Sequence, residues 1–387
     1  MSPAPPLDER WIPVAFGALD VRDAAAFSPE AEILVLPVIP GPALCLVGDG
    51  AALWRDLVDR GPLSPRALTV DQNDLLEQLQ HEGLVALGTS HTAAVTRLDR
   101  ALLSSPLHEL IYALVHRVAD AAGIRCLFVK GPALHHQGLR EREHSGDVDV
   151  WCDPARWDDL ASALEPWGWA RQPDPWRGTS VHHSTTLLPR AWGCEIDIHR
   201  RFPGLALDDE RAFDIVMTLS TTMVAAGTVV PIPRRDAHAV ISALHAIRPA
   251  VGRKVSVNDH LIGQRTLAAA PGAMDAARAL GAVAALRDDL AVAYPNADPG
   301  PDLGPPRDWL HRAQPDRPRA YLAALRSIPA RERIRALRNL VWPADDIALA
   351  SAADAGDPTT DAGRARRRRL IRAIRTWTAA FFRKGHR

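Results

Sequence analysis

Two short acidic segments are the part of this sequence best suited to chemistry. In Asp147-Val148-Asp149 the carboxylates are two residues apart, so an extended strand would point both of them to one face. Carboxylates side by side repel one another, and burying such a pair without a partner is expensive. A divalent cation is the usual compensation, and oxygen ligands of this kind suit Mg²⁺.

The second segment alternates in the same way. The stretch from Cys194 to His199 places Glu195, Asp197 and His199 on one face of a strand. The turn Lys130-Gly131 lies sixteen residues before the aspartate pair. Carboxylates on adjacent strands beside a lysine–glycine turn indicate a site for magnesium and a nucleoside triphosphate. We interpret His199 as a structural residue, held by a backbone or carboxylate hydrogen bond, in preference to a metal ligand.

The composition is that of an ordinary globular chain. With 387 residues, 47% hydrophobic and 24% charged, the sequence has room for two or three domains. Its four cysteines form no Cys-x-x-Cys pair, which argues against a zinc ribbon or a disulfide framework and fits a reducing cytoplasm. We find no signal-peptide pattern and no run of about eighteen apolar residues, so we expect a cytoplasmic chain without a transmembrane segment.

Charge is distributed unevenly. Residues 364–387 hold ten Lys and Arg and no Asp or Glu, which leaves 36 Lys and Arg against 46 Asp and Glu in the rest of the chain. Apolar residues of this tail fall on one helical stripe, namely Leu370, Ile371, Ile374, Trp377, Phe381 and Phe382. A basic amphipathic helix of this kind can lie on an anionic membrane surface, or bind an acidic partner or nucleic acid. The alternative is a helix docked on the acidic body of the chain itself.

Residues 30–90 have the pattern of a small winged-helix unit. The predicted order is strand, strand, helix, helix, helix, strand, with strands at 33–36, 44–47 and 84–87 and helices at 51–58, from Ser64-Pro65 and from the capping box that begins at Thr69. The segment LVGDGAALWRDLVDRGPLS…LLEQLQHEGLV resembles the PqqD-like domain, which binds precursor peptides in peptide natural-product pathways. That resemblance implies that a peptide adds as a strand to the exposed sheet edge. A winged helix used only for packing or dimerisation is the alternative.

The following segments predict a sheet with helices and then a helical region. Ser105-Pro106 begins an amphipathic helix. Further elements are expected as strands at 125–129, 147–151, 182–188 and 194–199, helices at 132–139 and 154–166, mostly helical chain over 205–294, a proline-rich loop at 295–318, a helix near 319–340 and a linker at 351–363. His135-His136 and His182-His183 have no spaced partners that would suggest a metal site. Asp259 is expected either to help position an acceptor or to cap a helix.

Three motifs in this region, LFVKGPALHHQGL…SGDVDVW…CEIDIHRRF, resemble an uncharacterised nucleotidyltransferase family of the DNA polymerase beta-like superfamily. The resemblance spans about residues 105–290. It implies an enzyme that uses two Mg²⁺ ions to transfer a nucleoside monophosphate from a nucleoside triphosphate to a hydroxyl. Metal ligation and catalysis would fall to Asp147, Asp149 and Asp197.

The same resemblance implies a phosphate-binding turn. Backbone N–H groups at Gly131 and the following helix would face phosphate, Lys130 would add a charge contact, and Arg142 would supply the arginine that the family tends to place before the aspartate pair. Pro132 departs from the superfamily's usual Gly-Ser and lacks an N–H.

Together these patterns predict an α+β fold in four parts. They are a winged-helix-like peptide-binding domain at 30–90, a nucleotidyltransferase core with a mixed sheet at 105–205, a helical C-terminal region at 206–345 and a basic amphipathic helix at 364–387. The predicted function is Mg²⁺-dependent nucleotidyl transfer, with a ribosomally made peptide as the suggested acceptor. A non-catalytic peptide carrier that keeps the fold and a regulator that binds nucleic acid are the alternatives.

Overall fold

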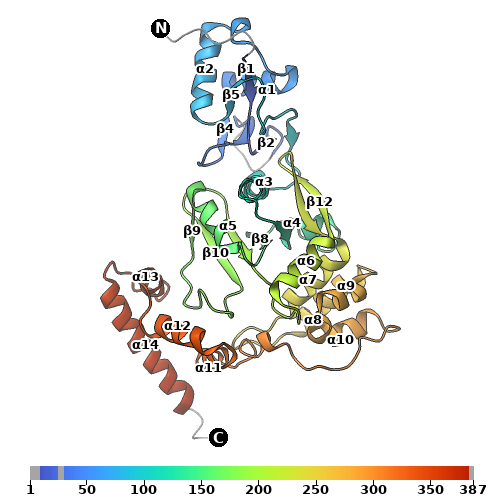
Figure 1. Cartoon of the computed structure of the whole chain (residues 1–387), viewed down its shortest axis with the longest axis vertical. Coiled ribbons are helices and arrows are strands. Elements are labelled where there is room, and N and C mark those ends of the chain that lie inside the picture. The colour runs from blue at the N-terminus through green and yellow to red at the C-terminus, as the bar shows by residue number, and fades with distance from the viewer. Residues whose placement is uncertain (1–8, 25–29, 383–387) are drawn as a thin grey trace. The chain divides into compact units, whose positions relative to one another are not determined.

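The computed structural model describes residues 9–24 and 30–382, with the side chains of Trp377 and residues 379–382 outside the description. The chain divides into two compact units. One comprises Met1–Arg171, Thr186–His199 and Val216–His238, and the other comprises Gln172–Thr185, Arg200–Ile215 and Ala239–Arg387. The fold is mixed, with several sheets followed by a helical C-terminal part (Figure 1).

The first unit begins with two small sheets and the helices beside them, drawn in blue in Figure 1. Strands β1 (Arg10–Pro13) and β5 (Val85–Gly88) form an antiparallel pair. A four-stranded sheet has the order β4-β3-β2-β6, formed by Leu44–Leu46, Ile33–Leu36, Gly17–Asp20 and Asp99–Arg100. The helices are α1 (Gly48–Arg60), the 3-10 turn η1 (Pro65–Ala67) and α2 (Val70–His81).

Most predicted elements of this region are present. The capping box of α2 forms, because the Thr69 hydroxyl accepts from the Gln72 N–H and the Gln72 side chain accepts from the Thr69 N–H. Trp54 of α1 is fully buried and its indole N–H donates to the Leu84 carbonyl at 2.9 Å. The helix expected from Ser64 is only a 3-10 turn, and strands β1, β2 and β6 were not predicted.

The central sheet of the first unit has five strands in the order β7-β8-β11-β10-β9. They are Cys126–Val129, Asp147–Cys152, Glu195–His199, Ser184–Pro189 and Trp169–Arg171. Strand β8 pairs antiparallel with β7 and parallel with β11, so the sheet is mixed as expected. The associated helices are α3 (Pro106–Ala121), α4 (Gly131–His136), α5 (Trp157–Leu164) and the 3-10 turn η2 (Glu165–Trp167).

Side-chain alternation separates the two faces of β8 and β11. Val148, Val150, Ile196 and Ile198 are fully buried in one hydrophobic core with helix α3. The alternate positions carry the aspartates and His199, so they point to the opposite face. The apolar residues thus hold the strands while the acidic residues form a polar surface on the sheet.

The expectation of mostly helical chain over 205–294 is wrong at a hairpin. Strands β12 (Ser220–Ala225) and β13 (Thr228–Pro233) pair antiparallel across Ala226-Gly227. Both turn residues have positive φ, 48° and 73°, which is the geometry of a two-residue hairpin turn. Alternate residues of the hairpin are buried in the core that contains α3, which favours strands over a helix here. They are Met223, Ala225, Val230 and Ile232.

The remaining chain is helical. Its elements are α6 (Asp209–Thr218), α7 (Arg235–Ile247), α8 (Val257–Ala268), α9 (Ala273–Leu280), α10 (Val283–Ala293), the 3-10 turn η3 (Arg307–Trp309), α11 (Arg317–Ser327), α12 (Ala330–Val341), α13 (Asp345–Ala353) and α14 (Ala362–Phe382). The single helix expected near 319–340 is interrupted at Ile328-Pro329, since proline cannot continue a helix. A linker was expected at 351–363, but its first three residues, 351–353, belong to helix α13.

The basic tail forms α14, which lies beside α13 (Figure 1). The pair packs through Ala348, Ala352 and Ala365, and Arg366 donates to the Pro343 carbonyl at 2.8 Å. Ile374 remains 55% exposed on the predicted apolar stripe. Docking on the chain itself, the alternative foreseen for this tail, therefore accounts for its first half; the side chains of Trp377, Phe381 and Phe382 lie outside the described residues. Among the described helices, none has the length and apolar character needed to cross a membrane.

Candidate functional site

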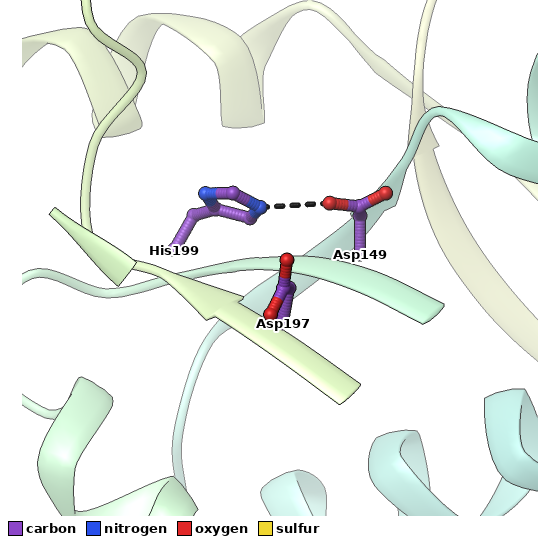
Figure 2. A group of neighbouring side chains, drawn as sticks. All are labelled: Asp149, Asp197 and His199. Carbon is purple, nitrogen blue, oxygen red and sulfur yellow. Dashed lines mark hydrogen bonds and ion pairs between the residues drawn. The ribbon is translucent and has the colours of Figure 1, made fainter. Parts of the chain in front are cut away.

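Strands β8 and β11 bring two of the predicted carboxylates together. In their parallel register Asp197 is directly opposite Asp149. Ligand atoms of Asp149, Asp197 and His199 all lie within 4.8 Å of one another, close enough for a shared metal ion. Figure 2 shows Asp149 on β8 and His199 on β11 pointing toward each other, with Asp197, also on β11, beside them. Asp149 is 3% exposed, so the site has a buried carboxylate at its centre.

Two donors converge on one oxygen of Asp149. The Lys130 ammonium lies 2.5 Å from Oδ1, and His199 Nε2 lies 2.8 Å from the same atom. Burial alone would raise the pKa of Asp149, but the Lys130 charge and the His199 hydrogen bond outweigh it and hold this pKa well below its ordinary value. Asp149 is therefore ionised, and the lysine supplies the positive charge that a buried carboxylate requires.

His199 serves as a donor in this arrangement. Burial lowers its pKa, and the nearby Lys130 charge acts in the same direction, although the hydrogen bond to Asp149 opposes both. A neutral imidazole facing a carboxylate must carry its proton on the facing nitrogen, so Nε2–H donates to Asp149. This is the carboxylate hydrogen bond expected from the sequence.

The donor set fits a divalent cation. Two carboxylates supply oxygen ligands that suit Mg²⁺ or Mn²⁺. If His199 gave up its hydrogen bond and contributed a nitrogen, the set would suit transition metals such as Mn²⁺ or Zn²⁺ better than Mg²⁺. The residues thus match a divalent ion, and the role of His199 determines which ion the site prefers.

Hydroxyl groups hold the other two aspartates. Thr186 on β10 donates to Asp197 Oδ1 at 2.5 Å, and Ser145 donates to Asp147 Oδ1 at 2.7 Å. Within the described chain, Asp147 does not belong to the group whose ligand atoms are mutually close. The structure thus joins Asp149 and Asp197 with His199, whereas the predicted triad contained Asp147 in place of the histidine.

The backbone of Lys130 is strained and is held by a buried histidine. Its φ is 61°, a left-handed value unusual for lysine. The Lys130 N–H donates to His238 Nε2 at 2.8 Å, and His238 Nδ1 lies 2.8 Å from Gln137 Oε1. Burial lowers the pKa of His238 to about 3, so the ring is neutral and its proton is on Nδ1, donating to Gln137. This network fixes the direction in which Lys130 leaves the turn.

Gly131 is tightly enclosed. Its φ is 46°, and an added Cβ would lie 3.3 Å from the Ser145 Cβ and 3.5 Å from the Tyr112 hydroxyl. Both constraints favour glycine at this position. The turn offers fewer backbone donors to a phosphate than the family resemblance implies, because the Lys130 N–H already bonds His238 and Pro132 has none.

Some predicted residues have no link to this group. Arg142 is exposed, and the described residues provide it with no hydrogen bond or ion pair. Asp259 fills the third position of a helix-capping box with Ser256 and also accepts from Arg253, which matches the capping alternative. His135 is exposed, whereas His182 is buried and faces Asp174 at 3.6 Å.

Sequence reasoning missed the supporting residues Ser145, Thr186 and His238. Ser145 precedes Asp147 by two residues but lies just before strand β8, so no strand pattern marked its contact with that carboxylate. Thr186 required knowledge of which strand neighbours β11. His238 follows the unpredicted hairpin, and no sequence pattern marked it. No protein-family model matches the chain, and no curated protein matches it either.

Proposed function

We propose that this chain is a metal-dependent nucleotidyltransferase. The observation that carries the proposal is the register of β8 and β11, which sets Asp149 opposite Asp197 with His199 within reach of a shared ion. The reaction class comes from the resemblance of the three motifs to the nucleotidyltransferase family. In this proposal residues 105–205 adopt the polymerase beta-like fold, and residues 30–90 form a PqqD-like winged helix.

The reaction joins an acceptor hydroxyl to the α-phosphorus of a nucleoside triphosphate. The new O–P bond forms as the bond to the β-phosphate breaks, pyrophosphate leaves, and the hydroxyl proton passes to a carboxylate oxygen of Asp197. Bound divalent ions supply charge that stabilises the triphosphate and the attacking oxygen. Asp149 and Asp197 would hold them, and Asp147 would join once its carboxylate turns from Ser145.

The other residues of the site orient these ligands. His199 holds the Asp149 carboxylate in place, and Thr186 does the same for Asp197. Lys130 neutralises Asp149 in the absence of an ion and must release it when an ion binds, which frees its ammonium for a phosphate oxygen. His238 fixes the backbone from which this lysine moves.

The N-terminal sheet suggests the acceptor. Strand β4 forms one edge of the order β4-β3-β2-β6, so a peptide can add beside it through main-chain hydrogen bonds. With the PqqD-like resemblance, this edge favours a ribosomally made peptide, or a molecule carried on one, as the acceptor. The ion pair between Lys130 and Asp149 favours a second candidate, a non-catalytic peptide carrier in which the lysine permanently takes the place of a metal.

An activity assay separates the two candidates. The chain is incubated with each labelled nucleoside triphosphate, Mg²⁺ or Mn²⁺ and candidate peptides, and the products are weighed by mass spectrometry. Transfer predicts a mass increase of one nucleotide that is lost in Asp149→Asn and Asp197→Asn and retained in Asp159→Asn, a control on an exposed ion pair of α5. Peptide binding without turnover under any condition would favour the carrier, and turnover that survives Asp149→Asn would refute the proposed site.

A further inference from the structure

Four arginines converge within the second unit from three separate stretches of chain. Arg200 and Arg201 follow β11, Arg248 follows α7, and Arg312 follows η3. Arg248 and Arg312 both contact the ring of His183, and the charges of Arg248 and Arg201 both lower the pKa of Arg312. His183, which precedes β10, lies 3.4 Å from Arg248 Nη1. We call these five residues the arginine cluster.

Arg312 contacts both ring nitrogens of His183. Its Nη2 lies 3.4 Å from His183 Nδ1 and 3.3 Å from Nε2. A nitrogen aligned with one ring lone pair would be much farther from the other ring nitrogen. The two similar distances mean that Nη2 approaches the ring between its nitrogens, while Arg312 Nε has no hydrogen-bond partner among the described residues.

The carboxylates around the cluster contact groups other than Arg312, and one of them pairs with two arginines of the cluster itself. Asp209 lies 3.3 Å from Arg200 and 3.9 Å from Arg201. Asp308 accepts the Gly204 N–H at 3.0 Å, and Glu332 accepts from the Ser180 N–H at 2.6 Å and from its hydroxyl at 2.8 Å. In the part of the chain that the structure describes, none of these carboxylates forms an ion pair with Arg312.

The surroundings of Arg312 are energetically unfavourable for its charge, and a bound anion would relieve this penalty. It is half-buried, and its Nε, like that of Arg201, is buried with no hydrogen-bond partner in the described chain. Burial, with the Arg248 and Arg201 charges, lowers the pKa of Arg312 to about 10, although Asp308 opposes this. Like charges held together in a partly buried place repel one another, and unsatisfied N–H groups there add to the penalty.

We propose that Arg201, Arg248 and Arg312, together with His183, bind a phosphoryl group of a small molecule. Planar guanidinium forks match phosphate oxygens in pairs, and a group with several negative charges offsets several guanidiniums at once. The inference goes beyond the proposed transfer reaction, because every residue belongs to the second unit and no divalent ion is required. Free phosphate or pyrophosphate and the phosphates of a nucleotide share this chemistry.

The test measures anion binding by the full chain in EDTA at low ionic strength. Inorganic phosphate, pyrophosphate and a nucleoside triphosphate are titrated separately by calorimetry, and thermal unfolding is followed in parallel. We expect pyrophosphate to bind and to raise the melting temperature. A nucleoside triphosphate that binds more tightly than pyrophosphate identifies a nucleotide as the ligand, and weaker binding identifies the free anion.

Variants locate the site. Arg312→Gln is expected to weaken pyrophosphate binding at least about tenfold, since it removes charged hydrogen bonds. Arg326→Gln, at an exposed position of α11, is the matched control and should bind normally. Arg201→Gln and Arg312→Lys extend the test in case Arg312→Gln does not fold, and both should weaken binding, because lysine lacks the planar fork.

Three results would overturn the proposal. They are no binding by the wild-type chain at millimolar pyrophosphate, unchanged binding in the folded cluster variants, and loss of binding in Asp149→Asn in the presence of EDTA. Asp149→Asn instead is expected to abolish nucleotidyl transfer while leaving this anion binding intact. Failure of one proposal is therefore distinguishable from failure of the other.

Discussion

Replacing Lys130 with methionine removes the only ammonium that contacts Asp149 among the described residues. The Lys130 side chain is 12% exposed and the Asp149 side chain 3%, so the pair is largely shielded from water. At 2.5 Å and an effective dielectric of about 20, the attraction is worth about 7 kcal/mol before desolvation is subtracted. Breaking a buried pair on one side typically costs about 3–5 kcal/mol. We expect the lower part of that range, because His199 still donates to Asp149.

Urea unfolding in EDTA measures this loss. The matched control is Lys254→Met, at an exposed position, which should change the free energy of unfolding by less than about 0.5 kcal/mol. In Lys130→Met, Mg²⁺ or Mn²⁺ should restore stability more than it stabilises the wild type, because the lysine no longer competes for Asp149. The reasoning fails if Lys130→Met is no less stable than the control, or if divalent ions stabilise the two proteins equally.

Three further substitutions test the frame around the site. Gly131→Ala should lower the free energy of thermal unfolding by about 1–2 kcal/mol, because alanine is strained at the positive φ of this position. It should also reduce nucleotidyl transfer, because the new methyl group displaces Ser145. Unchanged stability would contradict the described turn. The folded-state pKa of His238 lies near 3, below its ordinary 6.5, so its contribution to stability is complete above pH 6.5 and is lost as pH falls toward 3. Between pH 6.5 and 5 that loss is about 2 kcal/mol, and His238→Gln should flatten this part of the pH–stability curve if the ring is neutral and buried. Glu109→Ala leaves three backbone N–H groups without an acceptor, including that of Ala226 on the hairpin turn, and should lower the urea-unfolding free energy by at least about 3 kcal/mol.

Local patterns predicted the strands of the site and the face on which their side chains lie. Apolar and acidic residues alternate along β8 and β11. Because successive side chains of a strand point to opposite faces, burying the apolar residues puts all of the acidic residues on the other face. Helix α3 was equally clear, because Ser105 caps it and its leucines repeat at helical spacing. In each case the information lies within a few consecutive residues.

The arrangement of those elements was not predictable from the same information. That Asp197 pairs with Asp149, and that Asp147 bonds Ser145 instead of joining the group, depends on strand register and local side-chain contacts. The hairpin of β12 and β13 was missed because it is a short pair of strands in an alanine-rich, mostly helical stretch. His238 could not be recognised as part of the site either, because only the tertiary fold brings it next to Lys130.

Calorimetric titration of Mn²⁺ into the chain, with a non-hydrolysable nucleoside triphosphate analogue present, tests the metal site most directly. The account predicts binding by the wild-type protein that is lost in Asp197→Asn, a variant that leaves the buried pair of Lys130 and Asp149 intact. Equal Mn²⁺ affinity in the wild type and in Asp197→Asn would contradict it.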